Sequence, residues 1–220
     1  MTTATLLALV LTAAPPEPGR WFPVSARGGF TAFLSTATGS PTIGADLEVL
    51  ANVGTPGTGP LPFAHQGFVF GAGVRGFFGG SPWTACDWCL SRLTLGPVAR
   101  LSYVVSDRLQ GATVPDAALW LQVSPQLVRE NLPDAPLMPG GSRLAFAVRV
   151  DLGVTLVTWT LSLFKLVGLI HDEGSVEVGA ATLPLFALAF INHLALSWEW
   201  SGAAVSMSSH RFGATIGSSF

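Results

Sequence analysis

A repeated alternation of side chains, with a period of two, constrains this chain more than any other feature. In the stretch "RLAFAVRVD", Leu144, Phe146 and Val148 occupy one set of alternate positions, whereas Arg149 and Asp151 occupy the other. Alternate residues of a β-strand point to opposite faces, so this stretch predicts a strand with one apolar and one polar face. The same alternation recurs in residues 42–53, 66–78, 98–106, 193–201 and 211–220.

The composition of the chain favours a membrane environment. Charged residues make up 11% of the sequence, against roughly a quarter of an ordinary soluble domain. The hydrophobic share is 49%, and the mean hydropathy is +0.51. The net charge of −2, with basic residues scattered along the chain, argues against a nucleic-acid partner. Abundant glycine and proline favour short strands joined by turns over long helices.

Charged residues of the strand-like stretches fall on the face opposite the bulky apolar side chains. These residues are Asp46, Glu48, Arg75, Arg100, Arg149, Asp151, Glu177, Glu199 and Arg211. The rest of that face is mostly glycine, alanine, serine and threonine, where a soluble protein would normally carry lysine and glutamate. Charges removed from water need partners, so we expect these residues to pair with one another in an enclosed lumen. The predicted fold is an all-β, closed antiparallel transmembrane β-barrel in contact with a lipid bilayer.

The number of strands follows from where the alternation is interrupted. Together with candidate strands near residues 27–37, 117–128, 154–170 and 175–190, the pattern predicts about ten strands of a length that crosses a bilayer at a tilt. Eight strands result if residues 143–158 form one long strand, because the alternation continues through Gly153 without a slip. The segments 79–96 and 129–142, rich in glycine and proline, are expected to be loops.

Two apolar stretches leave other folds open. Residues 152–170 and 178–198 are each long enough for a transmembrane helix, which would make the chain a helical inner-membrane protein. Thr158, Thr160 and Ser162 form a polar line with a period of two in the first stretch, and Pro184 interrupts the second, so the barrel is preferred. A soluble β-domain with its apolar faces inside is the third interpretation.

The first residues of the chain resemble a leader for export. Residues 6–14 are an apolar run that is too short to span a bilayer but fits the hydrophobic region of a signal peptide, although basic residues before it are missing. We expect residues 1–20 to be a signal peptide and leader, cleaved near residues 13–16. Residues 21–220 are expected to form a single barrel domain.

Two cysteines lie in the predicted loop "SPWTACDWCLSR". In an exported protein, Cys86 and Cys89 are expected to form a disulfide that closes this loop. Free thiols are the alternative, and redox or metal chemistry is a third interpretation that lacks the strand-to-helix context and further ligands. The sequence indicates no metal site and no cofactor.

The alternation and the stretch "RFGATIGSSF" resemble small bacterial outer-membrane β-barrel proteins, the broad group of OmpA-, OmpX- and OmpW-like barrels. The resemblance implies location in the bacterial outer membrane and a structural, adhesive or narrow-pore role. It also implies that Phe212, Ile216 and Phe220 are part of a signal read by the barrel-assembly machinery. Tryptophan and phenylalanine residues, Trp120 among them, would form aromatic girdles at the membrane interfaces. The pattern leaves the oligomeric state open.

One short stretch, "HLALSWEW", carries residue types that also occur in hydrolase sites. It contains His193, Ser197 and Glu199, and a hydrolase acting on lipid or peptide is the enzymatic alternative. Residues two apart on a strand lie ~7 Å from each other, and no nucleophile motif frames the serine. His193 is expected in a turn, and Ser197 and Glu199 are expected to belong to the lumen, so the preferred interpretation is a protein that is not an enzyme.

Overall fold

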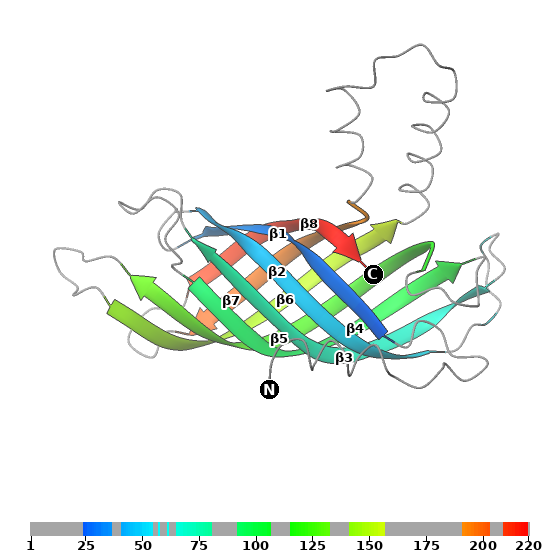
Figure 1. The fold of residues 1–220 in the computed structure, drawn as a ribbon, viewed down its shortest axis with the longest axis horizontal. Coiled ribbons are helices and arrows are strands. Elements are labelled where there is room, and N and C mark those ends of the chain that lie inside the picture. Colours follow the sequence, from blue (N-terminus) through cyan, green and yellow to red (C-terminus); the bar gives the residue numbers. More distant parts are fainter. Residues whose placement is uncertain are drawn as a thin grey trace, which may run out of the picture.

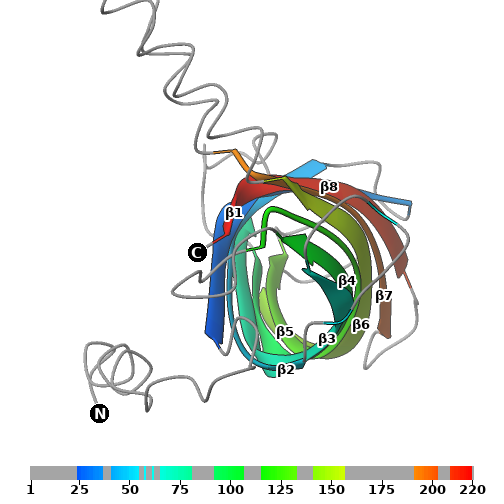
Figure 2. The same cartoon turned by 90° about the vertical axis from the view of Figure 1, so that its right-hand side faces the viewer.

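The computed structural model describes residues 24–36, 41–54, 57, 61, 65–80, 92–106, 115–132, 141–156, 191–202 and 209–219. They form eight strands in a closed barrel (Figures 1 and 2). The strands are β1 (Val24–Ser35), β2 (Pro41–Gly54), β3 (His65–Gly80), β4 (Arg92–Ser106), β5 (Ala117–Leu132), β6 (Gly141–Leu156), β7 (His193–Gly202) and β8 (Ser209–Ser219).

Each strand pairs in antiparallel fashion with the next, and β8 pairs with β1 to close the wall. At this closing seam Arg27 lies opposite Ser219 and Ser35 lies opposite Arg211. We call the end of the barrel where β1 begins and β8 finishes the near end, and the opposite end the far end. The connections β2–β3, β4–β5 and β6–β7 are at the near end, since the strands alternate in direction.

The strand count is eight, the smaller of the two counts that the sequence allows. Gly141–Leu156 is one uninterrupted strand, and its alternation passes through Gly153 as the pattern predicts. β6 and β7 pair directly with each other, with Leu152 opposite Leu196, so no further strand lies between them. Of the two additional candidate strands, residues 157–170 and 175–190 lie outside the described residues.

The faces of the strands follow the alternation in the sequence. On β5, Leu119, Leu121 and Val123 are exposed on the outside, whereas Trp120 and Gln122 are buried inside. The interior of an eight-stranded barrel is just wide enough to be filled by side chains, so the inner face is enclosed. Strands of this composition therefore bury their polar and charged residues and expose their apolar ones.

The outer surface is a band of large apolar side chains contributed by every strand. Exposed examples from the eight strands in order are Phe30, Leu47, Phe70, Leu101, Leu121, Leu152, Leu196 and Phe212. An apolar surface of this extent on a monomer marks contact with another apolar phase, and on a closed barrel it suggests a membrane. Among the described strands, Arg129 and Arg143 are exposed charged residues, and both lie toward the far end of β5 and β6.

Helices were the alternative for residues 152–170 and 178–198. Within these stretches, residues 152–156 belong to β6 and residues 193–198 belong to β7. Within the described ranges of the chain, no helix is long and apolar enough to pass through a bilayer.

Candidate functional site

Charged side chains from all eight strands meet inside the barrel. One contributor from each strand, in order, is Arg27, Asp46, Arg75, Arg92, Glu130, Arg149, Glu199 and Arg211. They form three groups along the barrel axis, which we call the near cluster, the middle ring and the far ring. Each group joins strands that are not neighbours, so the groups bridge the interior.

The middle ring is a closed cycle of two arginines and two aspartates. Arg75 contacts Asp46 at 2.5 Å and also pairs with Asp151. Arg149 contacts the same two carboxylates, Asp46 at 3.0 Å and Asp151 at 2.9 Å. Because Asp46 is on β2 and Arg149 and Asp151 are on β6, on the opposite side of the wall, the ring crosses the whole lumen.

Hydroxyl groups occupy further positions around the middle ring. Ser197 donates a hydrogen bond to Asp151 at 2.5 Å and accepts one from Arg149 at 3.0 Å. Thr31 donates to Asp46 at 3.0 Å. A buried ion pair is stabilised by additional hydrogen bonds to its members, and these hydroxyls from β7 and β1 supply some of them.

The near cluster consists of Arg27, Glu48, Arg100, Gln122 and Trp120. Glu48 accepts from Arg27 at 2.8 Å, from Gln122 at 2.6 Å, and from Arg100. The amide oxygen of Gln122 accepts from Arg100 at 2.8 Å and from Arg27 at 3.2 Å. The Trp120 ring contacts both guanidinium groups, with the Arg27 Cζ 4.2 Å and the Arg100 Cζ 4.8 Å from the ring centroid.

The far ring repeats the arrangement of the middle ring. Arg92 pairs with Glu130 and contacts Glu199 at 2.5 Å. Arg211 contacts the same two carboxylates, Glu130 at 2.5 Å and Glu199 at 3.3 Å. The ring joins β4, β5, β7 and β8 close to the far end.

The charges balance in two of the three groups. The middle ring and the far ring each hold two arginines and two carboxylates. The near cluster holds two arginines, Arg27 and Arg100, and one carboxylate, Glu48. Removing a charge from water costs several kcal/mol unless a partner compensates it, so the pairing within each ring is a condition for this interior to exist.

The structure places the residues expected in the lumen as follows. Asp46, Glu48, Arg75, Arg100, Arg149, Asp151, Glu199 and Arg211 all point into the interior and belong to one of the three groups. Glu177 lies outside the described residues.

Sequence reasoning missed three charged members of the interior, Arg27, Arg92 and Glu130. Glycine and proline near Arg92 and Glu130 predict loops at these residues, but in the structure β4 begins at Arg92 and β5 continues to Leu132. The alternation of Arg92 and Thr94 with exposed Leu93 and Leu95 is the signal that could have found the start of β4.

The structure corrects the expected position of Trp120. The expectation was a membrane-interface girdle, but Trp120 is 2% exposed and lies inside the barrel between two arginines. Trp120 and Gln122 are two residues apart on β5, so their side chains point to the same, inner face of the strand. Trp198 is on the outer surface, as expected, and stacks on His210 with ring centroids 5.8 Å apart.

The three candidate catalytic residues lie at different positions along the barrel and do not form one site. His193 is the first residue of β7 rather than part of a turn, and it is 1% exposed, with neither ring nitrogen bonded to a described residue. Ser197 is bonded to Asp151 and Arg149 in the middle ring. Glu199 belongs to the far ring.

Other predicted features lie partly or wholly outside the described residues. Phe212 and Ile216 are exposed on β8, toward the surrounding phase. Phe220, the two cysteines Cys86 and Cys89, and the expected leader at residues 1–20 fall outside the description. Comparison of the chain with protein-family models and with curated protein sequences found no match.

Proposed function

We propose that this protein is a bacterial outer-membrane β-barrel whose lumen is closed by its own side chains and whose role is structural. The observation that carries the proposal is the set of ion-paired groups bridging the interior from β1 to β8. A solute crossing the barrel would have to separate buried arginine–carboxylate pairs and leave their charges without partners in the interior, which is unfavourable. The barrel is therefore a rigid membrane-embedded scaffold that presents its connecting segments on either side of the membrane.

The outer membrane is the location that this architecture favours. Closed antiparallel barrels with an apolar outer band are the form in which β-strands cross bacterial outer membranes. Separation of inner and outer membranes of the producing cells on a density gradient tests the location. Recovery of the protein with inner-membrane markers would contradict it.

Conductance measurements test whether the lumen is closed. The refolded protein in a planar lipid bilayer is expected to give no stable conductance steps, whereas a general porin inserted in the same bilayer gives them. Regular steps from the wild-type protein would instead support the narrow-pore role.

We also propose that β8 is recognised by the barrel-assembly machinery. Phe212 is 56% exposed on β8, and Phe146 on β6 is a matched control at 49% exposed. The substitution Phe212→Asn is expected to lower the amount of assembled barrel in cells more than Phe146→Asn, while both variants refold equally well into vesicles. Equal effects of the two substitutions in cells would count against a special role of β8.

The proposal gives Ser197 a structural role rather than a catalytic one. The substitution Ser197→Ala removes one donor to Asp151 and one acceptor for Arg149. It is expected to lower the free energy of unfolding by about 1–3 kcal/mol. If the protein hydrolyses a lipid or peptide and Ser197→Ala abolishes that activity, the structural role is wrong.

A further inference from the structure

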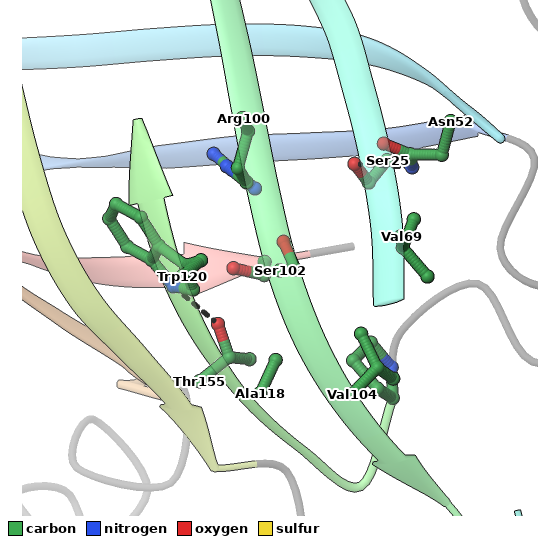
Figure 3. Close-up of a pocket in the computed structure, with 11 residues that line it drawn as sticks. Ser25, Asn52, Val69, Arg100, Ser102, Val104, Ala118, Trp120 and Thr155 are labelled. Atoms are coloured by element: carbon green, nitrogen blue, oxygen red, sulfur yellow. Dashed lines mark hydrogen bonds between the residues drawn. The ribbon is translucent and has the colours of Figure 1, made fainter. Parts of the chain in front are cut away.

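A small cavity lies inside the barrel toward the near end, next to the near cluster. Its volume is about 50 Å³. Figure 3 shows Arg100 and Trp120 on one side of it and Ser25 and Asn52 on another. The cavity reaches the near end through Ser25, Asn52, Pro115 and Ser219, which are only partly buried.

The charge around this cavity is positive. Arg100 lines it, and no acidic residue is among the described residues of the lining. The near cluster to which Arg100 belongs has one carboxylate for two arginines. The buried carboxylate Asp116 accepts a hydrogen bond from Ser106 and is not part of the lining.

The arginines of the near cluster retain unused donors. The Nε and Nη2 of Arg100 bond Gln122 and Glu48, which leaves its Nη1 without a hydrogen bond to a described residue. The Nη1 of Arg27 is buried and also has no hydrogen-bond partner among the described residues. Arg27 does not line the cavity, so Arg100 is the arginine that can bond an acceptor placed in it.

Hydroxyl groups in the lining can donate as well. Ser25 accepts a hydrogen bond from Asn52 at 3.0 Å, and Thr155 accepts one from Trp120 at 3.3 Å, so the proton of each hydroxyl remains free to point at a ligand. The Oγ of Ser219 is buried without a hydrogen-bond partner among the described residues. Donors of Arg100 and of three hydroxyl groups therefore share the lining of this cavity with apolar side chains such as Val69 and Val104.

We propose that the cavity binds a small inorganic anion such as chloride, held by the Arg100 guanidinium and the surrounding hydroxyls. The anion supplies the second negative charge that the near cluster lacks, and it makes the near cluster neutral like the two rings. A buried water needs roughly 10–15 Å³ of such accessible volume, so the cavity has room for a halide together with a few water molecules.

Bromide provides the direct test, because it substitutes for chloride and scatters X-rays anomalously. Crystals of the full chain grown in sodium bromide are expected to show an anomalous peak beside the Arg100 guanidinium. The absence of a peak in this cavity, with only water density there, would overturn the proposal whatever the role of the barrel in the membrane.

Variants separate a specific site from general attraction of anions to arginine. Arg100→Gln is expected to lose the peak, whereas Arg143→Gln, at an exposed arginine of β6, is expected to keep it. Should Arg100→Gln fail to fold, Ser25→Ala leaves all charges in place and is expected to lower the bromide occupancy. A peak of unchanged height in both cavity variants would contradict the proposed ligands.

The same site predicts an effect on stability in solution. A ligand that binds only the folded state raises the melting temperature. At constant ionic strength, the wild-type barrel and Arg143→Gln are expected to have a higher Tm in chloride than in gluconate. Arg100→Gln is expected to have the same Tm in both salts. An equal rise in all three proteins would contradict the site, because it would reflect a general salt effect.

Discussion

Arginine is the residue on which this interior depends. Its planar guanidinium can bond two carboxylates at once in fixed directions, which the ammonium group of lysine cannot do. Arg75 and Arg149 each contact both Asp46 and Asp151 in this way. Arg149 also reaches along its own strand to Asp151, two residues away, because its side chain spans the distance that separates two neighbours on one face.

Removal of one carboxylate tests the middle ring. Asp46→Ala leaves Arg75 and Arg149 with Asp151 as the one carboxylate of the ring that pairs with both. We expect the free energy of unfolding, measured by denaturant titration in lipid vesicles, to fall by about 3–5 kcal/mol. Arg143→Ala, at an exposed site, is the control and is expected to lower it by only about 0–1 kcal/mol, because water screens an exposed charge. Equal small effects would mean that the ring contributes nothing to stability.

Each strand has one face toward the interior of the barrel and one face on its outer surface. On β5 the alternation holds from Leu119 to Leu127, with each exposed leucine or valine between two buried residues. Leu121 lies opposite Leu101 on β4 and Leu152 on β6, in the middle of the wall. Leu144 lies opposite Arg129, toward the far end. The apolar band therefore has a centre and an edge that substitutions can distinguish.

The position of the band predicts a depth-dependent effect of charge. Leu121→Arg is expected to lower the free energy of unfolding in vesicles by about 2–4 kcal/mol, and Leu144→Arg by about 0–1 kcal/mol, since the cost of an arginine in lipid falls toward the interface. Denaturant titration of the two variants measures both values. A surface in contact with water would give two small and similar effects.

The glycines of the strands differ in the space available for a side chain. Gly153 faces the interior, where an added Cβ would lie 2.2 Å from the Trp120 ring, whereas at Gly76 the nearest atom is 3.5 Å from an added Cβ. Gly153→Ala is expected to destabilise the barrel by about 1–3 kcal/mol through overpacking. Gly76→Ala is expected to leave the stability unchanged or to raise it. The same denaturant titration compares the variants, and equal stabilities would show that Trp120 can move away.

The faces of the strands could be predicted from the sequence, because a period of two is a local property. The strand bounds could be predicted less well. β4 begins at Arg92 and β5 continues past Glu130, and local residue preferences do not show that these two residues lie opposite each other in the sheet. The partners of each arginine could not be predicted, because they are set by the stagger of eight strands around the lumen. Trp120 shows the same limit, since its preference for interfaces yields to its place on the inner face.

The whole molecule is stabilised by closure. Every described strand has two hydrogen-bonded neighbours, so the wall exposes no strand edge along its paired length. Closed barrels of this kind often resist detergent until they are heated. Unheated protein in dodecyl sulfate is therefore expected to migrate differently from boiled protein on a gel. Identical migration would argue against a stable closed wall.

Collision accessibility of spin labels along β5 tests most directly that the outer face contacts lipid. Single cysteines at Leu119, Leu121, Val123 and Arg129, introduced after Cys86 and Cys89 have been replaced by serine, carry the label in vesicles. Labels at positions 119, 121 and 123 are expected to collide often with oxygen, which concentrates in lipid, and seldom with a water-soluble nickel complex. The label at position 129 is expected to collide more with the nickel complex. Frequent nickel collisions and few oxygen collisions at position 121 would contradict the account, because the apolar band would then face water.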